Sequence, residues 1–120
     1  MLIRRLEDCY EFCAGDGTLL RELLHPAKAV LALRYSLAHA VVRPGEASVP
    51  HKLRTSEIYY ILNGQGVMHI NEEAEAVSAG MVIYIPPSAT QYIQNTGQNE
   101  LKFLCIVDPA WRQEDEEILS

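Results

Sequence analysis

Two stretches of the chain decide its fold, and each begins and ends with a residue that favours a turn. Residues 45–64 read GEASVPHKLRTSEIYYILNG, and residues 80–95 read GMVIYIPPSATQYIQN. Glycine and asparagine tolerate a positive φ, and proline cannot lie in a central strand. Between these residues stand short runs rich in β-branched and aromatic side chains, which favour strands. The two stretches therefore predict short strands joined by tight turns.

The positions that recur at fixed spacing are these: Gly45-x5-His51-x-Leu53-x3-Glu57-x6-Gly64 and Gly80-x5-Pro86-Pro87-Ser88-x2-Gln91-x3-Asn95. This spacing resembles the paired motifs of the cupin superfamily, G-x5-H-x-H-x3,4-E-x6-G and G-x5-P-x-G-x2-H-x3-N. The spacing agrees throughout, but three residue types differ. Leu53 stands where the family has its second histidine, Gln91 where it has its third, and Ser88 where it has a glycine.

The rest of the chain fits the same class. Short apolar runs separated by Gly, Pro and Asn are typical of an all-β sandwich or barrel. The expected strands are residues 18–24, 30–43, 57–62, 67–71, 75–77, 82–85, 90–94 and 101–107. The resemblance implies a double-stranded β-helix, which is the jelly-roll barrel of the cupins, assembled as a dimer. Residues 16–26 and 103–111 also resemble the ends of small single-domain cupins of the cupin 2 conserved barrel type, loosely labelled as similar to mannose-6-phosphate isomerase.

The 120 residues are expected to form a single cupin domain. Within it, residues 1–29 are an N-terminal segment expected at a dimer contact, and residues 32–107 are the barrel. Residues 110–120 contain the acidic run Glu114–Glu117 and are expected to be a solvated tail with at most one helical turn.

Composition excludes several classes of partner. Ten Lys and Arg against 16 Asp and Glu give a net charge of −6, which disfavours binding to nucleic acid or to an anionic membrane. The chain has no apolar run of membrane-spanning length and no signal-peptide pattern at its start, so we expect a cytoplasmic protein. The three cysteines are most simply free thiols in a reducing compartment.

Residues 57–62 are apolar at almost every position, which predicts a strand buried on both faces. Alternation places Glu57, Tyr59 and Ile61 on one face and Ile58, Tyr60 and Leu62 on the other. One face fills the barrel, and the other needs a cover. A second copy of the chain would supply it in a homodimer, and a covering N-terminal segment would serve equally.

The motif residues predict a site inside the barrel. His51 and Leu53 are two apart, so both point inward if the segment is extended. In cupins the four motif positions usually hold three histidines and one glutamate around a divalent metal. Carried over by position, this implies His51, Glu57 and Gln91 as ligands of Zn, Ni, Mn or Fe. The alternative is a hydrogen-bonded cluster without metal.

Other residues are candidates for supporting roles. Glu57 and Tyr59 would be the catalytic groups, moving protons or orienting a substrate, and Tyr84 is a further tyrosine expected near the barrel mouth. The plain alternative for each tyrosine is a core aromatic. His39 is the best candidate for an additional nitrogen ligand, although we favour an outward or inter-subunit position for it.

Three functions are compatible with these residues. The first is a metal-dependent isomerase or lyase acting on a small sugar or a keto-acid-like substrate. The second is a non-catalytic cupin that binds a small-molecule ligand in the barrel, which the presence of Leu53 favours. The third is a dimeric scaffold with a relic site. Because the fold hosts many activities, the site and not the fold has to decide among them.

Overall fold

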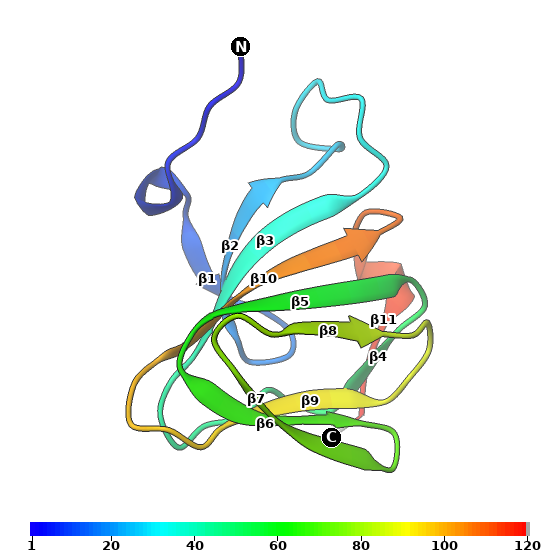
Figure 1. Cartoon of the computed structure of the whole chain (residues 1–120). Coiled ribbons are helices and arrows are strands. Elements are labelled where there is room, and N and C mark those ends of the chain that lie inside the picture. Colours follow the sequence, from blue (N-terminus) through cyan, green and yellow to red (C-terminus); the bar gives the residue numbers. More distant parts are fainter. Residues whose placement is uncertain (120) are drawn as a thin grey trace.

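The computed structural model describes residues 1–119, and its regular structure is almost wholly β (Figure 1). Two antiparallel sheets face each other across the interior. The first holds, in spatial order, β1 (Glu11–Cys13), β2 (Leu19–Leu24), β3 (Ser36–Val42), β10 (Leu101–Asp108), β5 (Ser56–Asn63) and β8 (Val82–Ile85). The second holds β11 (Glu116–Ile118), β4 (His51–Leu53), β9 (Gln91–Asn95), β6 (Gln65–Ile70) and β7 (Glu73–Ser78). The all-β expectation is confirmed.

Strands distant in the sequence lie side by side in the first sheet. β10 pairs with β3 along Leu101–Val107 and with β5 on its other edge. The last strand of the predicted barrel segment therefore lies in the middle of the sheet. Its side chains alternate between buried and half-buried along the whole strand. That alternation is the pattern of a strand with one face on the core.

The turn between β5 and β6 depends on one glycine. Gly64 has a φ of +89°, and a Cβ placed there would lie 2.7 Å from the carbonyl oxygen of Glu100. Any other residue would therefore be strained in its backbone, and its Cβ would also collide with the backbone just before β10. The tight turn expected from the sequence at this point is confirmed.

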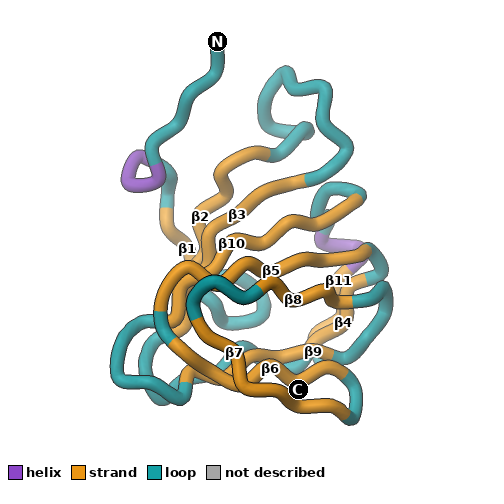
Figure 2. Tube along the Cα trace, viewed as in Figure 1, coloured by secondary structure: helices purple, strands orange, loops and turns teal. Residues whose placement is uncertain are grey.

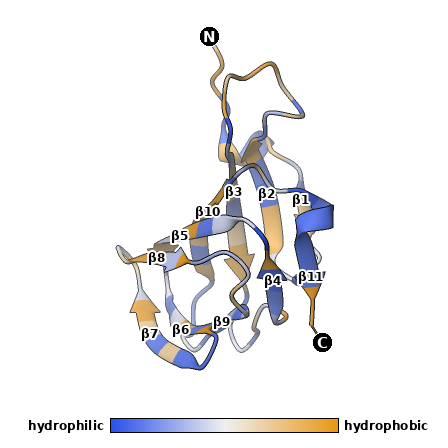
Figure 3. Cartoon of the chain, turned by 90° about the vertical axis from the view of Figure 1, so that its right-hand side faces the viewer, coloured by the Kyte–Doolittle hydropathy of each residue, from blue (hydrophilic) through white to orange (hydrophobic). Residues whose placement is uncertain are grey.

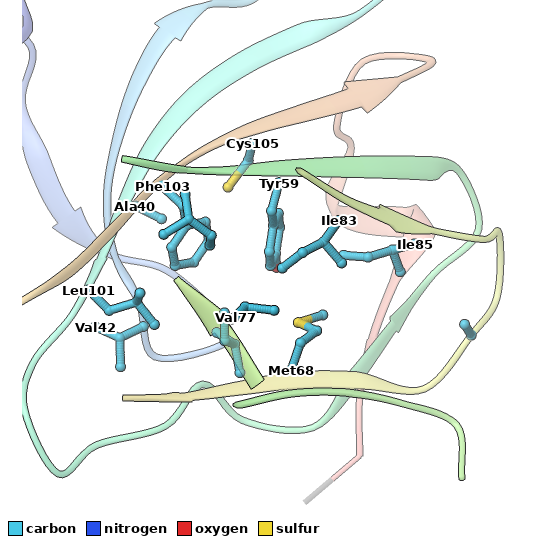
Figure 4. Close-up of a cluster of buried hydrophobic side chains, with 13 residues drawn as sticks. Ala40, Val42, Tyr59, Met68, Val77, Ile83, Ile85, Leu101, Phe103 and Cys105 are labelled. Carbon is cyan, nitrogen blue, oxygen red and sulfur yellow. The ribbon is translucent and has the colours of Figure 1, made fainter. Parts of the chain in front are cut away.

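The core lies between the two sheets (Figure 4). Phe103, Ile61 and Ile93 are fully buried there, and the rings of Tyr59 and Phe103 lie 4.4 Å apart between centroids. Each large apolar side chain that is fully buried stabilises the fold by about 1.5–3 kcal/mol. This packing holds the inward-facing residues of β5 in place.

The segment before β3 differs from expectation. The sequence predicted one long strand over residues 30–43, but β3 begins at Ser36, and a loop after β2 projects from the barrel (Figure 2). Val30 is fully exposed in this loop. The apolar residues of the loop lack the alternation of a half-buried strand. The predicted strand was too long because it relied on the apolar character of these residues and not on their periodicity.

The C-terminal segment also differs from the expected solvated tail. Its 3-10 turn, η2 (Gln113–Asp115), is held by two hydrogen bonds of 3.0 Å from Arg112 to the Asp115 carboxylate. β11 then pairs antiparallel with β4 (Figure 3), and the register places Glu116 opposite Leu53. A second 3-10 turn, η1 (Leu6–Asp8), precedes β1. Within residues 1–119, no helix is long and apolar enough to cross a membrane.

The outer face of the six-stranded sheet is apolar, as the sequence of β5 predicted. Ile58, Tyr60 and Leu62 are 37–44% exposed there, and the neighbouring Val82 and Tyr84 of β8 are 68% and 62% exposed. These residues form one continuous surface, because Tyr60 pairs with Val82 and Ile58 pairs with Tyr84. Within the described residues nothing covers this face, so the burial on both faces that the sequence predicted for β5 is not reached within one chain.

Candidate functional site

A cavity of about 210 Å³ lies between the sheets. Its apolar lining comes mainly from β2, β3 and β10: Leu20, Ala38, Ala40, Phe103, Cys105 and Val107. Glu22, Lys28 and Ser36 add polar groups to this lining, and His51, Glu57 and Tyr59 together with Asp16 and Glu116 form what we call its polar end. The volume is below the roughly 300–1,000 Å³ of sites for drug-sized ligands, so the cavity suits a smaller molecule.

Three of the predicted site residues form a single hydrogen-bond chain. The Tyr59 hydroxyl donates to Oε1 of Gln91 over 3.1 Å, and Nε2 of Gln91 donates to Oε1 of Glu57 over 3.0 Å. The chain crosses from β5 to β9, and all three side chains are at least 93% buried. It fixes the orientation of the Gln91 amide, because the tyrosine hydroxyl supplies the proton on one side and the carboxyl accepts on the other.

The chain ends on a carboxyl group that favours its neutral form. Burial raises the pKa of Glu57 to about 8, with the carboxylates of Asp16 and Glu116 adding to the rise and the hydrogen bond from Gln91 opposing it. Near neutral pH the group is therefore largely protonated. Since Oε1 accepts from Gln91, the proton belongs on Oε2, which has no hydrogen bond to any of the described residues.

His51 is held separately, on β4. Its Nδ1 lies 2.7 Å from the carbonyl oxygen of Val49, and its Nε2 lies 3.7 Å from Oδ2 of Asp16. A carbonyl can only accept, so Nδ1 carries the proton and fixes the ring. The prediction that His51 and Leu53 point inward is confirmed, because both are buried while Lys52 between them is not.

Two other candidates lie elsewhere. His39 occupies the face of β3 opposite to Ala38 and Ala40, which pack on the core, so it does not reach the cavity. The outward position that we favoured for it is confirmed, and its use as an additional ligand in the barrel is wrong. Tyr84 is also not at the mouth, since it is exposed on the outer face of β8.

The sequence reasoning missed two residues that lie outside the motifs. Asp16 comes from the turn between β1 and β2, and Glu116 comes from β11. Both residues line the polar end of the cavity, and their carboxylates add to the rise in the pKa of Glu57. The one local signal was Asp16-Gly17-Thr18, a typical Asx turn in which Oδ1 of Asp16 accepts from the backbone and the hydroxyl of Thr18.

The family of the chain follows from comparison with known sequences. The family described as "Cupin domain" (Cupin_2) matches residues 38–107, which is more than half of the chain. The chain belongs to the cupin family. The resemblance inferred from the two motifs is thereby confirmed, as is the cupin barrel as the fold class.

Several known cupins resemble this one. An uncharacterised protein of Methanocaldococcus jannaschii, MJ1618, is 46% identical over 110 residues, which cover 91% of this chain and 87% of that protein. An oxalate-binding protein of Thermotoga maritima is 37% identical over 90 residues, which cover 74% of this chain and 69% of that protein. Among solved structures, a predicted oxalate decarboxylase of Thermotoga maritima superposes with a TM-score of 0.80 at 25% identity, covering 90% of this chain and 99% of that one.

The motif residues of this cupin do not fit the metal centre that the family implies. Leu53 offers no donor, and Oε1 of Gln91 already accepts from Tyr59. Among residues 1–119, no three His, Cys, Asp or Glu side chains are gathered closely enough to form a ready-made metal site. Of the four family positions, only His51 keeps a nitrogen free to bind. A metal in this barrel would need donors from outside the two motifs.

Proposed function

We propose that this cupin binds a small, oxygen-rich organic molecule in the barrel cavity, with Glu57 as the group that recognises it. The observation that carries the proposal is the hydrogen-bond chain from Tyr59 through Gln91 to Glu57 at the polar end of the cavity. A protonated Oε2 of Glu57 donates a hydrogen bond, which suits a carbonyl, hydroxyl or carboxylate oxygen of the ligand. Apolar side chains of β3 and β10 would pack against the carbon atoms of the ligand.

The ligand class follows from the size and chemistry of the cavity. The cavity of about 210 Å³ is smaller than the sites of drug-sized ligands, so small sugars, keto acids and short carboxylic acids are the candidates. The name of the Thermotoga relative, oxalate-binding protein, supports the same class. Because fold kinship alone does not fix a ligand, the proposal depends on the cavity and not on that name.

A ligand screen tests this proposal. Thermal shift and then calorimetry are run with oxalate, pyruvate and a panel of small sugars against the wild type and an Ala38→Leu variant, which fills part of the cavity wall. The matched control is Ala74→Leu, on exposed β7. We expect a saturable ligand that is lost in Ala38→Leu and kept in Ala74→Leu. Equal binding to both variants would place the ligand outside the cavity.

A metal-dependent isomerase or lyase is the second candidate. It is favoured by the free Nε2 of His51 and by the raised pKa of Glu57, which lies close enough to neutral for the carboxyl to take up and return a proton. Tyr59 would orient Gln91, and through it Glu57. Such an activity would require a metal held by donors beyond the family positions.

We also propose that the protein forms a homodimer through the outer face of the six-stranded sheet. Arg21, His39, Leu104, Tyr60 and Val82 follow one another across this face in register. The row is apolar over β10, β5 and β8, and Nδ1 of His39 is buried without a hydrogen-bond partner among the described residues. Contiguous apolar surface of this kind is typical of an interface. A symmetric partner would cover the face with its own copy.

A further inference from the structure

A charged residue lies on the inward face of β2. Glu22 is opposite Ala38 in the pairing of β2 with β3, and Ala38 packs against the core. The Glu22 side chain is 18% exposed and lines the cavity, where its Oε1 lies 2.8 Å from the ammonium group of Lys28. Its Oε2 accepts no hydrogen bond from the described residues. One carboxylate oxygen in this wall is therefore free to bind a ligand.

Glu22 and Glu57 stand on opposite sides of the cavity. One row of paired residues crosses the inward face of the sheet, namely Glu22, Ala38, Cys105 and Tyr59. The two ends of the row, on β2 and β5, are three strand spacings apart, which is about 14 Å between backbones. Glu57 lies two residues before Tyr59 and on the same face of β5. The carboxylate of Glu22 and the neutral carboxyl of Glu57 can therefore contact the two ends of one small ligand.

Glu116 supplies a second unused acceptor. Its Oε2 accepts from Nε1 of Trp111 over 3.4 Å, while its Oε1 accepts from none of the described residues. Asp16 also lines the cavity, but its Oδ2 lies 3.7 Å from Nε2 of His51, so a protonated His51 would balance its charge. Glu22 and Glu116 are therefore the carboxylates left to accept hydrogen bonds from a ligand.

Several donors of the cavity lining are already engaged within the chain. They are the hydroxyl of Tyr59 on Gln91, the indole of Trp111 on Glu116 and the hydroxyl of Thr18 on Asp16. The protonated Oε2 of Glu57 is left to donate to a ligand, as is the hydroxyl of Ser36, whose oxygen accepts from the backbone of Trp111. Donors and acceptors thus both face the cavity, and a ligand that only accepts would leave Glu22 and Glu116 unsatisfied.

We propose that the ligand of the cavity is a short neutral polyhydroxy compound, a polyol or a small sugar, and that Glu22 selects it against acids of similar size. A hydroxyl group both donates and accepts, so such a ligand can donate to Glu22 and Glu116 and accept from Glu57. Hydrogen bonds to a carboxylate are also stronger than those between neutral groups. A ligand carboxylate can only accept, and both glutamates would repel its charge. This inference rests on the proposed binding of an organic molecule in the cavity and narrows its class, so that oxalate and pyruvate fall outside it.

Matched pairs of ligands test this class. The members of a pair share one carbon skeleton and differ at a terminal carbon, which carries a hydroxyl in the polyol and is a carboxylate in the acid: glycerol and glycerate, erythritol and erythronate, xylitol and xylonate. Calorimetry on the wild type, with oxalate, pyruvate and the small sugars of the first screen, should show at least tenfold tighter binding of a polyol than of its acid. Acids that bind as tightly as their polyols, or oxalate or pyruvate binding without any neutral compound, would overturn the inference and leave the cavity as a ligand site. Absence of binding by every compound would contradict the proposed function as well.

Glu22→Gln tests the residue. Glutamine keeps the shape of the side chain but removes its charge, which leaves the ammonium group of Lys28 without its partner. We expect at least tenfold weaker binding of the polyol and at least tenfold tighter binding of its acid, and the gain for the acid should vanish in Glu22→Gln/Lys28→Gln. Glu75→Gln, on exposed β7, is the control, and thermal unfolding verifies that each variant folds. A folded Glu22→Gln variant that keeps the wild-type preference would overturn the role of Glu22, and the comparison of ligand pairs on the wild type holds whether or not the variant folds.

Discussion

Glu116 lies directly opposite Leu53, where β11 pairs with β4. Leu53 stands where the cupin family has a histidine ligand, and its neighbour on the next strand carries a carboxylate. This relationship connects the C-terminal segment to the polar end of the cavity, and it makes residue 53 the most informative position at which to restore the family pattern.

Leu53→His should raise the affinity of the barrel for Zn²⁺ at the expense of stability. The new imidazole would lie two residues from His51 on β4 and opposite Glu116 on β11, and we expect at least tenfold tighter binding of Zn²⁺ by calorimetry. Burying a polar ring at a position that is 3% exposed should lower the free energy of unfolding by about 1–3 kcal/mol. The control is Leu62→His, on the outer face of β5, which should leave Zn²⁺ affinity unchanged. Equal gains in both variants would mean adventitious binding.

Tyr59→Phe should destabilise the protein although it removes only one oxygen. The hydroxyl is the donor to Oε1 of Gln91, so its loss leaves a buried amide oxygen unpaired and costs about 1–3 kcal/mol in the free energy of unfolding. Tyr60→Phe is the matched control, because Tyr60 is 44% exposed on the opposite face of the same strand. Urea denaturation should show little change for the control. A similar loss in the free energy of unfolding for both variants would show that the hydrogen bond from Tyr59 does not stabilise the fold.

Glu57 should make the stability of the protein depend on pH. Its pKa is raised from 4.5 to about 8 in the folded state, so the folded state keeps a proton that the unfolded state loses in this window. The free energy of unfolding should therefore fall as pH rises from about 4.5 to 8, by up to about 1.4 kcal/mol per pH unit from this group, and level off above.

In Glu57→Gln this contribution is absent, so the stability of the variant relative to the wild type should rise across the same window. Urea denaturation between pH 4 and 9 in the presence of a chelator measures the difference, with Glu75→Gln as the exposed control. Parallel curves for wild type and Glu57→Gln would show that Glu57 titrates normally.

A charge on the apolar outer face should separate the proposed dimer. Tyr84→Glu introduces a carboxylate among exposed apolar residues of β5 and β8, and light scattering should report a shift from dimer to monomer. Ala76→Glu, on exposed β7 in the other sheet, is the control and should stay dimeric. A wild type that is monomeric at every concentration tested would contradict this interface.

The sequence predicted the barrel because the motif spacing and the turn residues act locally. Gly64 marks a turn that only glycine fits, and the alternation in residues 101–107 matches β10. The inward direction of His51 and Leu53 followed from strand geometry alone. These features need no knowledge of distant contacts, and all of them were predicted correctly.

The parts that were missed depend on contacts between the ends of the chain and the barrel. β11 is three residues long within an acidic segment, and nothing in that segment indicates its pairing with β4. Asp16 reads as an ordinary turn residue until the fold brings it to His51. The sequence also gave no sign that Gln91 would use its oxygen to accept from Tyr59, because that depends on the packing of two separate strands.

The protonation of Glu57 is tested most directly by a carboxyl ¹³C NMR titration of the protein labelled at glutamate, with Glu57→Gln used to assign the signal. A midpoint near 8 would show that a neutral carboxyl ends the chain from Tyr59 through Gln91 and faces the ligand cavity. A midpoint near the ordinary value of 4.5 would show a carboxylate there at neutral pH, and would contradict its role as the donor that recognises an oxygen-rich ligand.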